Sequence, residues 1–169
     1  MGRDKAFLDF EGESLWHRQL ATLRQLSPER LMISGPSREE WREYEIVEDA
    51  LADAGPLAGV AAALRKCASP RLVVLAVDLP KMTADFLRSL LQLCEDRKGV
   101  VPRACDRFEP LAAVYPVDCA ALADAALRDG DFSMQRFVRR AQEQDLLRER
   151  IISEAETVLF ANLNTPADL

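Results

Sequence analysis

Apolar residues follow two different spacings that alternate along the chain. Spacings of three and four residues predict helices over residues 14–26, 83–95, 119–127 and 134–141. A further helix over 55–67 begins with Pro56, at a position where the missing N–H costs nothing. Short apolar runs bounded by turn residues predict strands over residues 31–33, 44–47, 71–77, 99–101, 111–115 and 157–161.

Strands and helices in alternation are typical of α/β proteins. The pattern predicts a doubly wound three-layer α/β/α sandwich with a mostly parallel sheet. The run RLVVLAV from Arg71 to Val77 is apolar without interruption, which predicts a strand covered on both faces. A chain of 169 residues is long enough for one domain with a substantial core, so we expect a single domain over 1–169.

Composition and charge exclude several classes of function. The net charge of −6 argues against a nucleic-acid partner, which would require a basic surface. No apolar run approaches the roughly 20 residues that a membrane span needs, so no membrane partner is expected. The four cysteines contain no C-x-x-C pair and lie among apolar neighbours. We therefore interpret them as buried thiols in a reducing compartment and predict a cytoplasmic protein.

Polar residues follow several predicted strands, at the edge of the sheet where α/β proteins bind ligands. These residues are Asp49, Asp78, Asn162 and Asn164. Asp78 directly follows the most apolar strand, where a carboxylate is costly unless it is paired or bound to a metal. Mg²⁺ takes one or two carboxylates together with substrate phosphates, which predicts a metal role for Asp78. The alternative is a turn aspartate that caps its own loop.

Two other segments could contact an anion. Lys5 follows Gly2 and Asp4 and could hold phosphates as a compact positive charge, although a solvated lysine is the simpler interpretation. Gly55 and Gly59 enclose the start of a helix, where backbone N–H groups attract anions. The same glycines could instead allow the helix to pack closely on the sheet.

Several segments in order resemble one family, the molybdenum cofactor guanylyltransferases (MobA family). The first is similar to the end of the nucleotidyltransferase signature L-A-G-G-x-S-x-R-M-G-x-D-K, and the others are similar to later stretches of the family. They read MGRDKAFLDFEG, EDALADAGPLAG, VLAVDLPKM, FEPLAAVYP and FANLNTPADL. Together they cover nearly the whole chain, and GPLAG with the terminal N-x-N-T-P-x-D-L is the most specific combination.

The resemblance implies a Rossmann-like nucleotidyltransferase fold and transfer of GMP from GTP to molybdopterin, with pyrophosphate as the second product. By match to the family motifs, Asp78 would bind Mg²⁺ and Lys5 would hold the leaving phosphates. Asp49, Gly55 and Gly59 would contact the nucleotide. On the acceptor side the resemblance implies Asn162 and Asn164.

The resemblance also carries an expectation about the beginning of the domain. The family places a strand and the L-A-G-G turn before the M-G-x-D-K segment, so we expect this first strand and half-loop to be missing from the sequence as given. Transient contacts with molybdenum cofactor biosynthesis proteins and molybdoenzyme chaperones are expected from the same source. Two alternatives stay open, which are another small-molecule nucleotidyltransferase (CMP transfer to molybdopterin or sugar-phosphate activation) and a non-catalytic nucleotide-binding relative.

Overall fold

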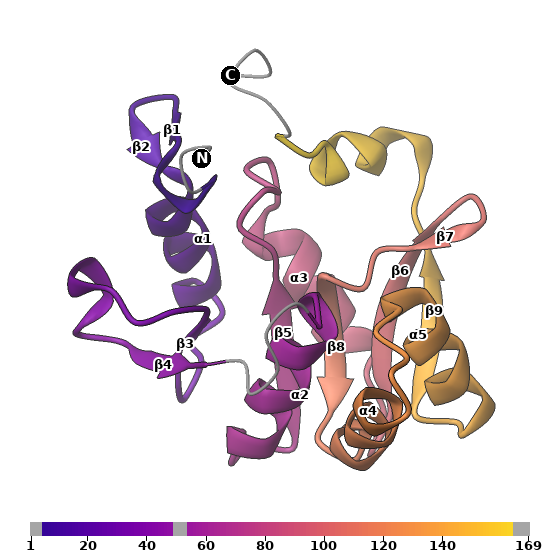
Figure 1. Ribbon diagram of the computed structural model, residues 1–169. Helices are drawn as coiled ribbons and strands as arrows, with labels where there is room; N and C mark the ends of the chain where they lie inside the picture. Colours follow the sequence, from indigo (N-terminus) through magenta and orange to yellow (C-terminus); the bar gives the residue numbers. More distant parts are fainter. Residues whose placement is uncertain (1–4, 49–53, 164–169) are drawn as a thin grey trace.

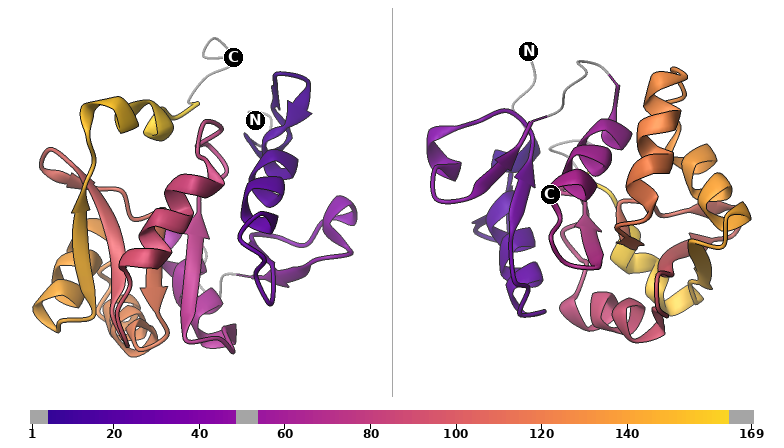
Figure 2. Two further views of the ribbon diagram at one scale, coloured as in Figure 1. Left: turned by 180° about the vertical axis from the view of Figure 1, so that it is seen from behind. Right: turned by 90° about the horizontal axis from the view of Figure 1, so that it is seen from below.

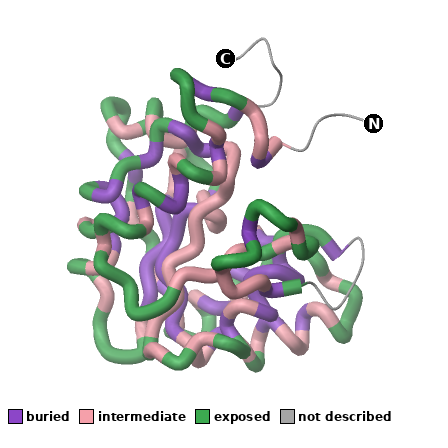
Figure 3. Tube along the Cα trace, turned by 90° about the vertical axis from the view of Figure 1, so that its left-hand side faces the viewer, coloured by how far each residue is buried: buried purple, intermediate pink, exposed green. Residues whose placement is uncertain are grey.

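A mixed sheet forms the centre of the computed structural model, which describes residues 5–48 and 54–163 (Figure 1). In these residues the sheet has five strands. Four of them follow the order β5-β8-β6-β7, and the fifth, β9, pairs with β6 outside this order. The strands are β5 (Arg71–Leu75), β6 (Gly99–Ala104), β7 (Arg107–Phe108), β8 (Ala112–Pro116) and β9 (Leu147–Ile151). β6 and β8 lie inside the sheet and contain its most buried positions (Figure 3).

Successive residues of the central strands supply two separate cores, because side chains alternate between the faces of a sheet. On one face, Val101, Ala113 and Tyr115 pack against α2 (Pro56–Lys66), α4 (Cys119–Arg128) and α5 (Met134–Glu143). On the other face, Val100 and Val114 pack against α3 (Ala84–Leu93), with the end of α1 (Leu15–Arg24) at its margin. Helices therefore cover both faces of the sheet, as Figures 1 and 2 show.

The N-terminal third of the chain forms smaller units beside this sheet. The short helix η1 (Lys5–Phe7) leads into a hairpin of β1 (Asp9–Phe10) and β2 (Glu13–Ser14). After α1, the strands β3 (Met32–Ser34) and β4 (Glu45–Val47) pair in parallel, with η2 (Glu39–Trp41) between them. Among the described residues β3 and β4 form their own sheet, and α2 packs against β3, β4 and β5.

The predicted α/β class and three-layer architecture are confirmed. The directions of β5, β6 and β9 agree with a mostly parallel sheet, but β8 runs antiparallel between β5 and β6. The predicted strand over 71–77 is found as Arg71–Leu75 and is covered on both faces, since Leu72 and Val74 pack against one core and Val73 and Leu75 against the other. Its residues are nevertheless less buried than predicted. Every residue of β5 is half-buried, because β5 is an edge strand with β8 as its one neighbour in the described part of the sheet. The missing first strand stays a prediction.

The C-terminal segment corrects another prediction. Residues 157–161 are not a strand, because they belong to the 3-10 helix η3 (Glu154–Phe160). The last strand is β9, whose sequence LRERI carries three charged residues and has too little apolar content for the pattern to reveal it. These charges find partners across the surface, including Arg103 for Glu149 at 2.9 Å.

The prediction of four buried cysteines is also wrong in part. Cys119 is buried, Cys67 and Cys94 are half-buried, Cys105 is exposed on the turn between β6 and β7, and all four thiols are free. Burial raises the pKa of the Cys119 thiol to about 12, so this thiol behaves as a small apolar side chain. Among the described residues no helix is long and apolar enough to cross a membrane.

An ion pair holds η3 against the end of β9. Arg150 Nη2 lies 2.6 Å from Glu156 Oε1, and the Arg150 guanidinium lies 4.6 Å from the centre of the Phe86 ring on α3. Glu156 Oε2 also accepts hydrogen bonds from the backbone N–H and the hydroxyl of Ser153 at 2.9 and 2.8 Å. The hydrogen bonds from Arg150 and Ser153 lower the pKa of Glu156 from 4.5 to about 2.

We predict that Glu156→Gln destabilises the fold at pH 7 by about 1 kcal/mol, a value for a partly solvated pair. The pKa of Glu156 is lower in the folded state than in the unfolded state. The wild type is therefore more stable than the variant above pH 4.5, and this difference in stability disappears as the pH falls toward 2. Urea unfolding at several pH values measures this difference. Glu154→Gln, an exposed neighbour on η3, is the control and should match the wild type. An equal stability loss for Glu156→Gln at pH 7 and pH 2.5 would contradict the account.

Candidate active site at the end of strand β5

Asp78 lies in the loop between β5 and α3, at the edge of the sheet where β5 ends. Leu75 pairs with Ala112 at the end of the β5–β8 ladder, and the Ala76 N–H continues it by donating to the Leu111 carbonyl at 2.7 Å. The loop then turns through Asp78, and Thr83 caps α3 by accepting a hydrogen bond from the Phe86 N–H. The Asp78 side chain is 27% exposed, so its carboxylate can be reached by a ligand.

Lys5, from near the beginning of the sequence, lies beside Asp78 in the structure. Lys5 Nζ lies 3.8 Å from Asp78 Oδ2, and its side chain is 43% exposed. This approach follows from apolar packing, because Phe10 of the β1–β2 hairpin and Leu15 of α1 form a small core with Leu163. Lys5 and Asp78, which we predicted separately, therefore form one ion pair. Both of its side chains are partly exposed to solvent.

Helix α1 fixes the backbone around Asp78. Gln19 is buried, and its Nε2 donates to the carbonyls of Ala76 at 3.0 Å and Leu79 at 2.7 Å. Arg18 Nε donates to the Pro80 carbonyl at 2.7 Å. The sequence analysis missed both residues, and the only signal was a polar side chain on the buried face of α1. These contacts hold the loop on both sides of Asp78.

The C-terminal segment adds a third anchor. The Leu163 N–H donates to the Asp78 carbonyl at 3.1 Å, which places the exposed Asn162 beside the loop that carries Asp78. This position agrees with a role for Asn162 near the predicted site. Asn164 and Asp49 lie outside the described residues, so their predicted roles stay predictions.

Gly55 and Gly59 both belong to the start of α2. Gly55 is the N-cap of α2 with φ 66° and ψ −164°, a conformation that favours glycine. Gly59 is buried within the helix, which agrees with the packing alternative. A short connection joins the end of α2 to the start of β5 and α2 packs against β5, so the first turn of α2 points toward the edge where β5 ends. No described contact joins either glycine to Asp78.

The donor set fits a cation held partly by a substrate. Among the described residues no group of three or more histidine, cysteine or acidic side chains could hold a metal ion. Asp78 offers a single accessible carboxylate beside Lys5. One carboxylate suits Mg²⁺, which usually keeps waters and takes its other ligands from nucleotide phosphates.

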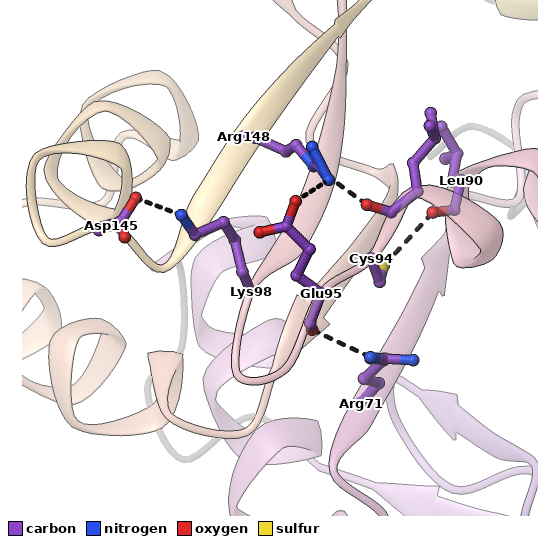
Figure 4. Close-up of polar contacts among 8 residues, drawn as sticks. Arg71, Leu90, Cys94, Glu95, Lys98, Asp145 and Arg148 are labelled. Atoms are coloured by element: carbon purple, nitrogen blue, oxygen red, sulfur yellow. Dashed lines mark hydrogen bonds and ion pairs between the residues drawn. The ribbon is translucent and has the colours of Figure 1, made fainter.

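The opposite edge of the sheet carries a charged cluster of a different kind (Figure 4). Arg148 pairs with the Glu95 carboxylate and donates to the Leu93 carbonyl at 3.0 Å, and Arg71 donates to the Glu95 carbonyl at 2.9 Å. Lys98 pairs with Asp145 at 2.5 Å. The charges of this cluster are paired with one another or with backbone carbonyls, so its contacts join β5, β9 and the turn before β6.

Comparison with known proteins identifies the family. The family described as "MobA-like NTP transferase domain" matches residues 1–146. The chain belongs to this family. It is 43% identical over 173 residues to a protein of Opitutus terrae named "Probable molybdenum cofactor guanylyltransferase", a match that covers 99% of this chain and 86% of the relative. A "Molybdenum cofactor guanylyltransferase" of Pseudomonas syringae pv. tomato is 32% identical, with coverage of 98% and 82%.

Solved structures agree with the fold. A molybdopterin-guanine dinucleotide biosynthesis protein A from Archaeoglobus fulgidus superimposes with a TM-score of 0.74 and 23% identity, covering 99% of this chain and 87% of that one. A 2-C-methyl-D-erythritol 4-phosphate cytidylyltransferase from Thermus thermophilus gives a TM-score of 0.71 and 16% identity, with coverage of 97% and 89%. Because both identities are below 25%, these two structures support the fold of the chain and not its activity.

We predict that Lys5→Ala weakens the binding of a nucleoside triphosphate by about tenfold or more, because a charge-assisted hydrogen bond to phosphate is worth roughly 1.5–3 kcal/mol. Lys5→Arg should restore part of the affinity, since a planar guanidinium does not reproduce a compact ammonium. Isothermal titration calorimetry with GTP and Mg²⁺ measures both. Lys66→Ala, a lysine of α2 that pairs with Glu45, is the control. Unchanged affinity in Lys5→Ala would remove Lys5 from the phosphate site.

Proposed function

We propose that this protein transfers GMP from GTP to the terminal phosphate of molybdopterin and releases pyrophosphate. Membership of the MobA-like NTP transferase domain family and the names of its relatives support this reaction. The observation that carries the proposal is the pairing of Lys5 with Asp78 at the end of β5. This pair places a cation and a carboxylate at the sheet edge where α/β proteins bind their ligands.

The chemistry needs positioning and charge neutralisation more than a protein nucleophile. An oxygen of the acceptor phosphate forms the new bond to the α-phosphorus, and the bond from that phosphorus to the pyrophosphate oxygen breaks. Lys5 is suited to bind the phosphates that leave. Asp78 would hold Mg²⁺, which when bound neutralises phosphate charge. Gln19, Arg18 and Leu163 fix the loop of Asp78, so the backbone that carries its carboxylate is held in place before substrate binds.

The remaining predicted residues take the family roles within this proposal. Gly55 and Gly59 would allow the nucleotide to approach the first turn of α2, and Asp49 would contact the nucleoside. Asn162 and Asn164 would lie on the acceptor side, as the hydrogen bond between Leu163 and Asp78 supports for Asn162. We further propose a cytoplasmic location, which the free thiols support. Transient contacts with molybdenum cofactor biosynthesis proteins and molybdoenzyme chaperones belong to the same proposal.

The proposed function predicts which nucleotide the protein binds most tightly. GTP with Mg²⁺ should raise the melting temperature of the protein more than CTP or UTP at equal concentration, because at a given concentration the ligand that binds the native state more tightly stabilises it more. Differential scanning fluorimetry with each nucleotide, with and without Mg²⁺, makes the comparison. A larger shift with CTP would favour cytidylyl transfer, the activity named for the similar Thermus structure.

The proposed function also predicts the effect of removing the charge of Asp78. Asp78→Asn keeps the size of the side chain and removes its negative charge, so the fold should be retained while pyrophosphate release with GTP, Mg²⁺ and molybdopterin falls by about 100-fold or more. Asp129→Asn, which alters an exposed aspartate at the end of α4, should have the activity of the wild type. Near-normal turnover in Asp78→Asn would exclude Asp78 from the mechanism.

A further inference from the structure

Glu109 is a second acidic residue at the edge of the sheet that carries Asp78. Asp78 follows β5 and Glu109 precedes the neighbouring strand β8, and each stands three positions beyond the Leu75–Ala112 pair that ends the β5–β8 ladder. The hydrogen bond from the Ala76 N–H to the Leu111 carbonyl keeps the two segments side by side beyond that pair. The connection from β7 to β8, which carries Glu109, reaches β8 at this same edge (Figure 1).

The backbone on both sides of Glu109 is held by the side chains of the half-buried Gln135 and the buried Tyr115. Gln135 of α5 bonds twice to Phe108, accepting from its N–H at 3.1 Å and donating to its carbonyl at 2.9 Å. The hydroxyl of the buried Tyr115 donates to the Pro110 carbonyl at 2.7 Å. The N–H of Glu109 itself donates to the Pro102 carbonyl at 2.8 Å. Hydrogen bonds therefore hold the backbone of this short segment at Phe108, Glu109 and Pro110.

The Glu109 carboxylate makes no hydrogen bond or ion pair with any residue in 5–48 or 54–163, in contrast to its backbone. The side chain is half-buried, and burial raises its pKa, an effect that Arg107 only partly opposes. A half-buried carboxylate without such a partner costs stability when it carries its charge. A rigid backbone around a costly unpartnered charge is the arrangement expected for a group that binds a ligand.

The chemistry of the substrates limits what this carboxylate can contact. It would repel the phosphates of GTP and of molybdopterin, so it must face hydrogen-bond donors. Both substrates of the proposed function carry such donors, because guanine and the pterin share a 2-amino-4-oxopyrimidine ring. The ring N–H and the amino group lie side by side in one plane, and the two oxygens of a carboxylate can accept both hydrogen bonds.

We propose that Glu109 is a substrate-binding residue that accepts hydrogen bonds from the 2-amino-4-oxopyrimidine edge of guanine or of the pterin. This inference rests on the proposed function for the identity of the substrates. Glu109 would select rings that have the amino group, whereas Lys5 and Asp78 act on phosphates and metal. The residue would therefore affect affinity and specificity more than the rate of bond formation.

The test measures binding, so it does not depend on turnover. Calorimetric titrations with GTP, ITP and molybdopterin are compared for the wild type, Glu109→Gln, Glu109→Asp and the control Glu143→Gln, which alters an exposed glutamate at the end of α5. ITP lacks the amino group of guanine. If Glu109 binds guanine, Glu109→Gln should lose about tenfold or more in GTP affinity, equal to about 1.4 kcal/mol, and should no longer prefer GTP over ITP. If it binds the pterin, only the affinity for molybdopterin should fall by this factor.

Either loss supports the proposal and identifies the ring, and Glu109→Asp should recover part of it because it keeps the charge. Wild-type affinities of Glu109→Gln for all three ligands would overturn the proposal, as would a change confined to the Mg²⁺ requirement. Thermal melting at pH 7 gives a separate check, because Glu109→Gln removes a half-buried carboxylate and should melt no lower than the wild type. Ligand binding by a wild type that releases no pyrophosphate would contradict the proposed function and leave this comparison valid.

Discussion

The position of Asp78 depends on hydrogen bonds that two distant parts of the chain make to the loop after β5. Gln19 and Arg18 hold the loop from α1, and the Leu163 N–H holds the Asp78 carbonyl from the C-terminal segment. Each of these groups is brought there by apolar packing, since Phe10, Leu15 and Leu163 form one small core. The candidate site is thus assembled from the beginning, middle and end of the chain and cannot be assigned to one motif.

The two edges of the sheet differ in how their charges are satisfied, and this difference separates structural from functional roles. At the edge where β5 begins, Arg71, Arg148 and Lys98 are paired or bonded to backbone carbonyls, which fixes β5 and β9 relative to each other. At the edge where β5 ends, Asp78 has one distant cation and Glu109 has no ion-pair partner among the described residues. A half-buried carboxylate without a partner, such as that of Glu109, is costly for folding and useful for binding.

Much of the fold could be predicted from the sequence, because helices such as α3 and α5 have clear apolar periodicity and serine or threonine caps. The burial of β5 was misjudged, since an apolar run does not show whether a strand has one neighbour or two. Strand β9 was missed because three of its residues are charged, and two of them, Arg148 and Glu149, pair with residues far away in the sequence. The 3-10 helix η3 was predicted as a strand from its apolar residues alone.

The candidate site was predicted residue by residue but not as an arrangement. Asp78 could be found because it follows an apolar strand, whereas Lys5 depended on the family resemblance. Their contact at 3.8 Å joins residues that no local pattern relates. Gln19 and Glu109 were not found, because a buried glutamine and a glutamate in a loop have no distinctive sequence signal. Their proposed roles rest on hydrogen bonds that only the structure reveals, from Gln19 to the Ala76 carbonyl and from the Glu109 N–H to the Pro102 carbonyl.

The most direct test of the central claim is the identity of the product. The purified protein is incubated with molybdopterin, Mg²⁺ and equal concentrations of GTP and CTP, and the pterin products are analysed by mass spectrometry. The account predicts molybdopterin guanine dinucleotide, with one pyrophosphate released for each dinucleotide formed. Formation of the cytosine dinucleotide as the main product, or of no dinucleotide at all, would contradict it.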